Sequence, residues 1–200
     1  MNDIILKTTN FLAKFVNAEP QSDKYAILKY GVELFFLNLY KTIILIILAV
    51  ILGIWKEVLI FGIAYGILRS YAFGIHIDSG VGCTIWGLAY YIGSSYLARY
   101  IKISFGMLIW VYTILILIFL LHAPSGTKKR PVGKIEKKHL KTISLLLLII
   151  MYLLSVHVIG SGIIINLIML AAVCEAINIM PITYRIFKQE RGEISNEKVD

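Results

Sequence analysis

The sequence predicts an all-α polytopic membrane protein with six transmembrane helices, preceded by an N-terminal amphipathic helix. Hydrophobic residues make up 58% of the chain and charged residues 16%, with a mean hydropathy of +0.80, unlike a soluble domain of this length. The apolar residues also gather in long runs, and a helix needs ~20 of them to cross the ~30 Å hydrocarbon core. We expect spans over residues 34–54, 58–68, 84–98, 104–121, 143–159 and 162–182.

Residues 1–30 are predicted to form an interfacial region ahead of a membrane domain over 31–184. From Ile4 to Val16 the apolar residues fall on one helical face, and Lys7 and Lys14 lie opposite. This pattern favours a helix lying in the membrane interface; packing of its apolar face into the bundle is the alternative. Ser22 is placed to cap a second helix that continues into the first span.

The second and third spans are short, even when they are extended towards each other. Each then holds about 16 residues, or ~24 Å of helix, which is less than the hydrocarbon thickness. Either the segment between them lies in a recess at one membrane face, or the helices tilt and the bilayer thins around them.

Lysine and arginine predict the orientation of the spans. Of 20 such residues, 16 lie on the side of the two termini, Lys56, Arg99 and Lys102 lie on the other side, and Lys41 lies inside the first span. Because basic loops stay cytoplasmic, we expect both termini, including the tail 185–200, and the segment 69–83 to be cytoplasmic. The net charge of +8 then reflects topology and the membrane surface, and no nucleic-acid partner is expected.

The segment 69–83 holds the residues best suited to covalent chemistry. His76 and Cys83 lie seven positions apart in a glycine-rich gap between two spans. A thiol becomes an efficient nucleophile when a neighbouring imidazole accepts its proton and stays beside it as imidazolium. Metal binding is poorly supported, since His76, Asp78 and Cys83 would supply only three ligands, and no cofactor is expected.

Three neighbours of this pair have two interpretations each. Arg69 either binds a substrate carboxylate or raises the local positive potential, or it is an ordinary anchor at the end of a span. Gly74 either permits a close backbone approach or gives the loop flexibility. Asp78 either orients His76 or is an unspecific neighbour.

Two further residues lie inside the last predicted span. Cys174 has no histidine close to it in sequence, which favours a buried packing thiol. A bare carboxylate at Glu175 would be costly in the membrane, so it needs a polar partner. The candidate partners are Asn166, Asn178 and Lys41.

The segment 122–142 is the most basic part of the chain. Lys128, Lys129 and Arg130 are followed within it by four more lysines. A solvated cytoplasmic loop explains this composition; binding of an acidic partner or of anionic lipid headgroups is the alternative.

The order of these features resembles the accessory gene regulator B (AgrB) family over essentially the whole chain. The resemblance rests on an Arg-x4-Gly-x-His-x6-Cys segment from Arg69 to Cys83, an Ala-Pro-x3-Lys-Lys-Arg-Pro loop from Ala123, and a Glu-Ala-x4-Pro ending from Glu175. Family members often have a small residue after the histidine, whereas Ile77 is bulky here.

The resemblance implies a multi-pass cysteine endopeptidase in the plasma membrane of a Gram-positive bacterium. Cys83 and His76 match the family's catalytic pair, and the substrate would be an AgrD-like quorum-sensing propeptide with an acidic C-terminal tail. Cleavage through a thioester would allow cyclisation to a thiolactone or lactone, Lys128, Lys129 and Arg130 would attract the tail, and a homodimer is implied. The competing class is a non-enzymatic membrane transporter or signalling scaffold, in which His76 and Cys83 merely pack.

Overall fold

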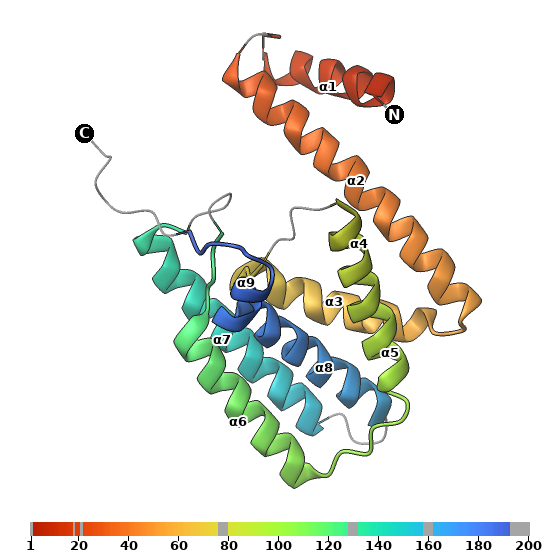
Figure 1. The fold of residues 1–200 in the computed structure, drawn as a ribbon, viewed down its shortest axis with the longest axis vertical. Coiled ribbons are helices and arrows are strands. Elements are labelled where there is room, and N and C mark those ends of the chain that lie inside the picture. The colour runs from red at the N-terminus through yellow and green to blue at the C-terminus, as the bar shows by residue number, and fades with distance from the viewer. Residues whose placement is uncertain are drawn as a thin grey trace. The chain divides into compact units, whose positions relative to one another are not determined.

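The computed structural model describes residues 2–17, 19–20, 22–75, 80–127, 132–157 and 162–192 (Figure 1). Regular secondary structure in these residues is helical, and isolated β-bridges pair Phe73 with Ser125 and Thr127 with Arg191. The predicted all-α class is therefore confirmed. The chain divides into two compact units, Met1–Ile51 and Leu52–Asp200.

The first unit contains α1 (Asn2–Val16) and α2 (Asp23–Ile51), which contact each other. Ile5, Thr9 and Ala13, spaced by four, form the buried stripe of α1, as expected for one face of a helix. The larger apolar side chains of Phe11 and Phe15 are instead exposed. Ser22 caps α2, because its Oγ accepts a hydrogen bond from the Tyr25 backbone N–H at 3.3 Å, which confirms the predicted cap.

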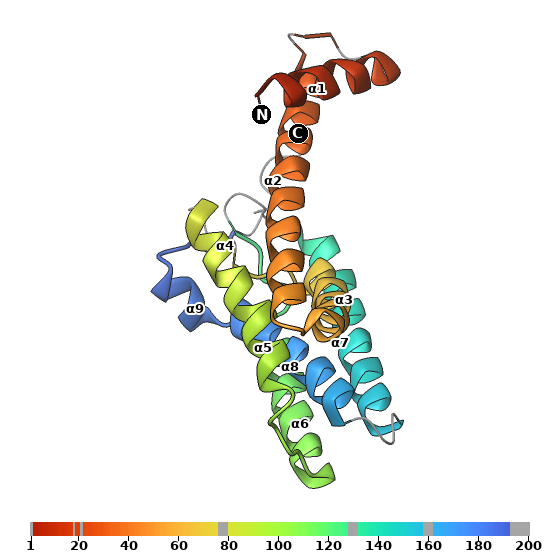
Figure 2. The same cartoon turned by 90° about the vertical axis from the view of Figure 1, so that its right-hand side faces the viewer.

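The second unit is built around α8 (Gly162–Ile179), which contacts helices on several sides (Figures 1 and 2). Of its 18 residues, 12 are buried, so α8 supplies much of the core. Its neighbours are α3 (Trp55–Ala72), α5 (Ser94–Leu97), α6 (Phe105–His122), α7 (Lys134–His157) and α9 (Pro181–Ile186). The remaining elements are α4 (Gly80–Leu88) and the π-helical stretch η1 (Ala89–Gly93), which continues into α5.

Four helices in the described residues are long and apolar enough to cross a membrane: Asp23–Ile51, Phe105–His122, Glu136–His157 and Gly162–Ile179. They cover the first, fourth, fifth and sixth predicted spans. The second and third predicted spans are helical, but their helices are not both long and apolar enough to meet this criterion. Lys56, Glu57 and Arg69 all lie on α3, and residues 80–97 are divided among α4, η1 and α5.

Both segments predicted as cytoplasmic loops are partly helical. Arg69 lies in the last turn of α3, and α7 already begins at Lys134, so Lys137, Lys138 and Lys141 are helical. Lysine and glutamate are favourable helix residues, and their side chains reach water readily from the end of a helix. The charge of residues 134–141 therefore indicates contact with water but does not exclude a helix.

Candidate functional site

Of the eight residues that the sequence singled out for catalysis, its support or substrate binding, the structure describes three, Arg69, Gly74 and Cys83. The other five lie outside the described residues: His76, Asp78, Lys128, Lys129 and Arg130. The site is therefore built from the segments that lead into His76 and from the helix that holds Cys83.

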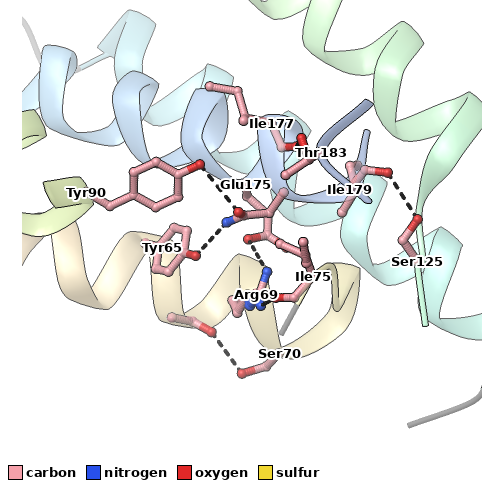
Figure 3. Close-up of polar contacts among 12 residues, drawn as sticks. Tyr65, Arg69, Ser70, Ile75, Tyr90, Ser125, Glu175, Ile177, Ile179 and Thr183 are labelled. Atoms are coloured by element: carbon pink, nitrogen blue, oxygen red, sulfur yellow. Dashed lines mark hydrogen bonds and ion pairs between the residues drawn. The ribbon is translucent and has the colours of Figure 1, made fainter. Parts of the chain in front are cut away.

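Arg69 forms an ion pair with Glu175 that joins α3 to α8 (Figure 3). Nη1 of Arg69 lies 3.5 Å from Oε2 of Glu175, and the side chains are 29% and 0% exposed, respectively. Nη2 of Arg69 also donates to the carbonyl oxygen of Ile75. A fully buried carboxylate needs such a compensating charge, so Arg69 is already engaged inside the protein. The sequence did not suggest Arg69 as the partner of Glu175.

Gly74 occupies a position where a side chain has no room. Its φ is +97°, and a Cβ built there would lie 2.6 Å from Nη1 of Arg69 and 3.1 Å from the Asn178 carbonyl oxygen. Positive φ and this close approach both favour glycine. Two backbone hydrogen bonds fix the segment, from Gly74 N–H to the Ser125 oxygen at 2.8 Å and from Ile75 N–H to the Asn178 oxygen at 3.1 Å.

Ser125 connects the turn after α6 to both the end of α3 and the end of α8. Its N–H donates to the Ala72 oxygen at 3.0 Å, and its Oγ donates to the Ile179 oxygen at 3.1 Å. The hydroxyl of Tyr184 on α9 donates to the Ser125 oxygen at 2.8 Å. Burial raises the pKa of Tyr184 to about 12, so this hydroxyl keeps its proton at neutral pH. Nothing in the sequence marked Ser125 except its place directly after Ala123-Pro124.

Asn178 extends the same network towards η1. Its side-chain N–H donates to the Tyr65 hydroxyl at 2.7 Å, and its Oδ1 accepts from the Tyr90 hydroxyl at 3.4 Å. The Asn178 side chain is buried, and buried amides are costly unless they are hydrogen-bonded. Asn178 thus contacts α3 and η1 through its side chain and Ile75 through its backbone.

Cys83 is the fourth residue of α4, a free and half-buried thiol. Trp86 lies one turn further along α4. Its ring centroid is 4.9 Å from that of Tyr90, with the rings tilted, and 4.9 Å from that of Phe187 after α9, in an edge-to-face contact. Aromatic contacts of this kind hold a helix in place. The helix of Cys83 is therefore fastened by Tyr90 to the same buried network that fixes Ile75.

Two other predictions concern cysteine and metal chemistry. Cys174 is buried, with its Sγ 3.4 Å from the Ser94 Oγ, which confirms the prediction of a packing thiol. Within the described part of the chain, no group of three or more His, Cys, Asp or Glu residues is arranged to hold a metal ion.

Comparison with known proteins identifies the family of this chain. The profile of the family described as AgrB: Accessory gene regulator B matches residues 5–179. A putative AgrB-like protein of Clostridium acetobutylicum is 32% identical over 160 residues, covering 80% of this chain and 76% of the relative.

Two further relatives are similar over most of their length. The accessory gene regulator protein B of Staphylococcus haemolyticus is 29% identical over 78% of this chain and 82% of the relative. A putative AgrB-like protein of Listeria innocua is 25% identical over 90% of this chain and 95% of the relative. No solved structure matches the chain. The extent of the profile match and the identity to the clostridial relative show that this chain belongs to the accessory gene regulator B family.

Proposed function

We propose that this protein is a membrane-embedded cysteine endopeptidase that cleaves the C-terminal part of an AgrD-like quorum-sensing propeptide. Cys83 is the nucleophile and His76 is the general base. The observation that carries the proposal is the ion pair between Arg69 and the buried Glu175, because Arg69 also binds the Ile75 carbonyl directly before His76. Membership in the accessory gene regulator B family supports the same assignment.

The reaction follows from the chemistry of the two side chains. The Cys83 sulfur attacks the carbonyl carbon of the scissile peptide bond, while His76 takes the thiol proton and then donates it to the departing amine. The product is a thioester between Cys83 and the shortened propeptide. A cysteine or serine inside the substrate then attacks the thioester carbonyl, which frees Cys83 and closes a thiolactone or lactone ring.

The buried network has a positioning role in this proposal. Arg69 binds the Ile75 carbonyl and the Glu175 carboxylate. Substrate carboxylates are bound by other cations. Gly74 allows the backbone to approach Asn178 closely, and the Asn178 side chain reaches Tyr90 on η1, which directly follows the helix that holds Cys83. Catalytic groups must be held within fractions of an ångström of the productive geometry, and buried, hydrogen-bonded neighbours provide that rigidity.

The membrane arrangement in this proposal has six spans. The four apolar helices cross the bilayer, and α3 and residues 80–97 form two shorter spans whose connection includes His76. Both termini and the site are cytoplasmic in this arrangement, which the excess of basic residues on their side supports. The exposed Phe11 and Phe15 side chains of α1 favour a helix lying in the interface.

Substrate binding in this proposal uses the cations of residues 128–130, which attract the acidic tail of the propeptide. The implied homodimer would need a face that the protomer leaves open. Gly62 is not on such a face, because a Cβ there would lie 3.1 Å from the Tyr91 ring. Gly66, one turn later on α3, has no neighbouring atom within 4 Å of its built Cβ among the described residues.

The two cysteines allow a direct test of the nucleophile. In vesicles with a synthetic propeptide, Cys83→Ala should abolish cleavage, while the matched variant Cys174→Ala should retain it. His76→Gln should retain propeptide binding and slow acylation by about 10²- to 10⁴-fold, the usual contribution of a positioned base. Near-normal cleavage by Cys83→Ala would contradict the proposal, as would loss of cleavage only in Cys174→Ala.

A further inference from the structure

A pocket of about 200 Å³ lies where α6 ends and α7 begins. Its basic side chains come from three separate segments: His122 at the end of α6, Lys137 and Lys141 on α7, and Arg191 after α9. Among the lining residues that the structure describes, none is acidic. A concave site with one sign of charge focuses its field and concentrates counter-ions.

The pocket has at least one fixed cation. Nη2 of Arg191 donates to the Ile179 carbonyl oxygen at 2.7 Å, and its guanidinium lies 5.1 Å from the Tyr184 ring centroid. Lys137 and Lys141 are one turn apart on α7, so their side chains lie on the same face of that helix. A planar guanidinium with two ammonium groups beside it suits an oxyanion with several oxygens.

The position of the pocket indicates which anion it meets. His122 is the last residue of α6, and Lys141 is the last charged residue of α7 before its apolar run. Both helices are long and apolar enough to cross a membrane, so the pocket lies where their apolar parts end. This is the depth at which lipid headgroups are found.

An apolar surface leads out of the pocket along α6. Leu121 lines the pocket and is 75% exposed. Leu117 and Ile114, which share its helical face, are also exposed. An acyl chain would pack against this apolar surface, whereas a free anion or an acidic peptide would gain no binding energy from it.

We propose that this pocket binds the phosphate group of an anionic glycerophospholipid, whose acyl chain lies against the Ile114–Leu121 face of α6. The recognised group is a phosphate diester with a net negative charge, held by Lys137, Lys141 and Arg191. This lipid site goes beyond the propeptide cleavage proposed above and does not depend on it.

The test is a binding measurement with no catalytic readout. The purified full-length protein in a neutral detergent is titrated with phosphatidylglycerol, and bound lipid is counted by native mass spectrometry. Lys141→Gln should weaken the tightest phosphatidylglycerol site about fivefold, the effect of losing ~1 kcal/mol from one surface cation. Lys138→Gln is the matched control: it removes the same charge from the same helix, but its exposed side chain does not line the pocket. It should bind within about twofold of the unaltered protein.

Parallel titrations separate the sources of the anion. Phosphatidylcholine and inorganic phosphate at the same concentrations should not occupy the site. If Lys141→Gln and Lys138→Gln weaken phosphatidylglycerol binding equally, the effect comes from general surface charge and the proposal is overturned. Lys141-dependent binding of inorganic phosphate alone, or of a glutamate-rich peptide in preference to phosphatidylglycerol, would also overturn it, since the pocket would then take a soluble ligand.

Discussion

The guanidinium of Arg69 lies 3.5 Å from the buried carboxylate of Glu175 and also donates to the carbonyl of Ile75. One side chain thus joins the core helix α8 to the backbone immediately before His76. Replacing Glu175 leaves the Arg69 guanidinium, which is 29% exposed, without the charge that holds it beside Ile75. The pair therefore offers a way to disturb the segment before His76 without touching either proposed catalytic side chain.

Glu175→Gln should lower kcat for propeptide cleavage at least tenfold and leave KM within about threefold, because a misplaced base weakens the transition state rather than ground-state binding. The matched control is Glu57→Gln, which breaks the ion pair to Arg99 at the other end of α3, where Nη2 of Arg99 lies 2.5 Å from Oε1 of Glu57. That pair is partly exposed, and its loss should cost no more than ~1 kcal/mol. Steady-state kinetics in vesicles measure both. Equal kcat losses in the two variants would contradict a positioning role for Glu175.

Gly74→Ala should abolish most cleavage, because the new Cβ meets Nη1 of Arg69 at 2.6 Å in a backbone conformation with φ of +97°. The strain of that conformation alone is about 1–2 kcal/mol for a non-glycine residue. Gly106→Ala in α6 is the control, since its Cβ has open space and alanine favours a helix. Cleavage and thermal unfolding should be followed together. A Gly74→Ala variant as active as Gly106→Ala would show that the close approach does not matter for the reaction.

The sequence predicted what is encoded by local pattern and missed what depends on distant pairing. Composition predicted the helical class, and a serine before an apolar helix predicted the Ser22 cap. The link between Arg69 and Glu175 spans 106 residues, and nothing local to either residue indicates it. Ser125 was missed for a related reason, because its hydrogen bonds go to the ends of α3 and α8, which only the fold brings together.

Lys137, Lys138 and Lys141 were assigned on their charge to the cytoplasmic loop 122–142, and they lie on the first turns of α7. Charge indicates contact with water but does not distinguish a loop from the end of a helix. The chemistry of His76 and Cys83 was predicted from residue type and from family resemblance. The structure describes the segments on either side of the pair, Ile75 and α4. The catalytic role of His76 and Cys83 stays a prediction.

The six-span arrangement predicts which introduced thiols react from outside the cell. In a Cys83→Ala/Cys174→Ala background, Lys102→Cys should be labelled by a membrane-impermeant maleimide added to intact cells, since Lys102 lies in the turn before α6. Lys138→Cys, near the start of α7, should be labelled only after the membrane is permeabilised. Both side chains are exposed in the protomer, so access depends on the side of the membrane. External labelling of Lys138→Cys would overturn the cytoplasmic placement of the site.

Neutralising Lys128, Lys129 and Arg130 together should raise KM for an acidic-tailed propeptide more than it lowers kcat. These cations would bind the tail equally well in the ground state and the transition state, and such uniform binding changes KM alone. The difference should shrink as salt rises, because exposed charges are screened over about 8 to 10 Å at physiological ionic strength.

The control for that triple variant is a propeptide whose acidic tail residues are replaced by amides, which the unaltered protein and the variant should bind equally well. The measurements use vesicles of phosphatidylcholine, which carry no net lipid charge. A change in KM in these vesicles therefore reflects propeptide binding and not lipid binding in the pocket at Lys141. If the variant keeps its KM for the acidic tail at low salt, residues 128–130 act only in topology. The acidic tail must then be held by cations outside residues 128–130.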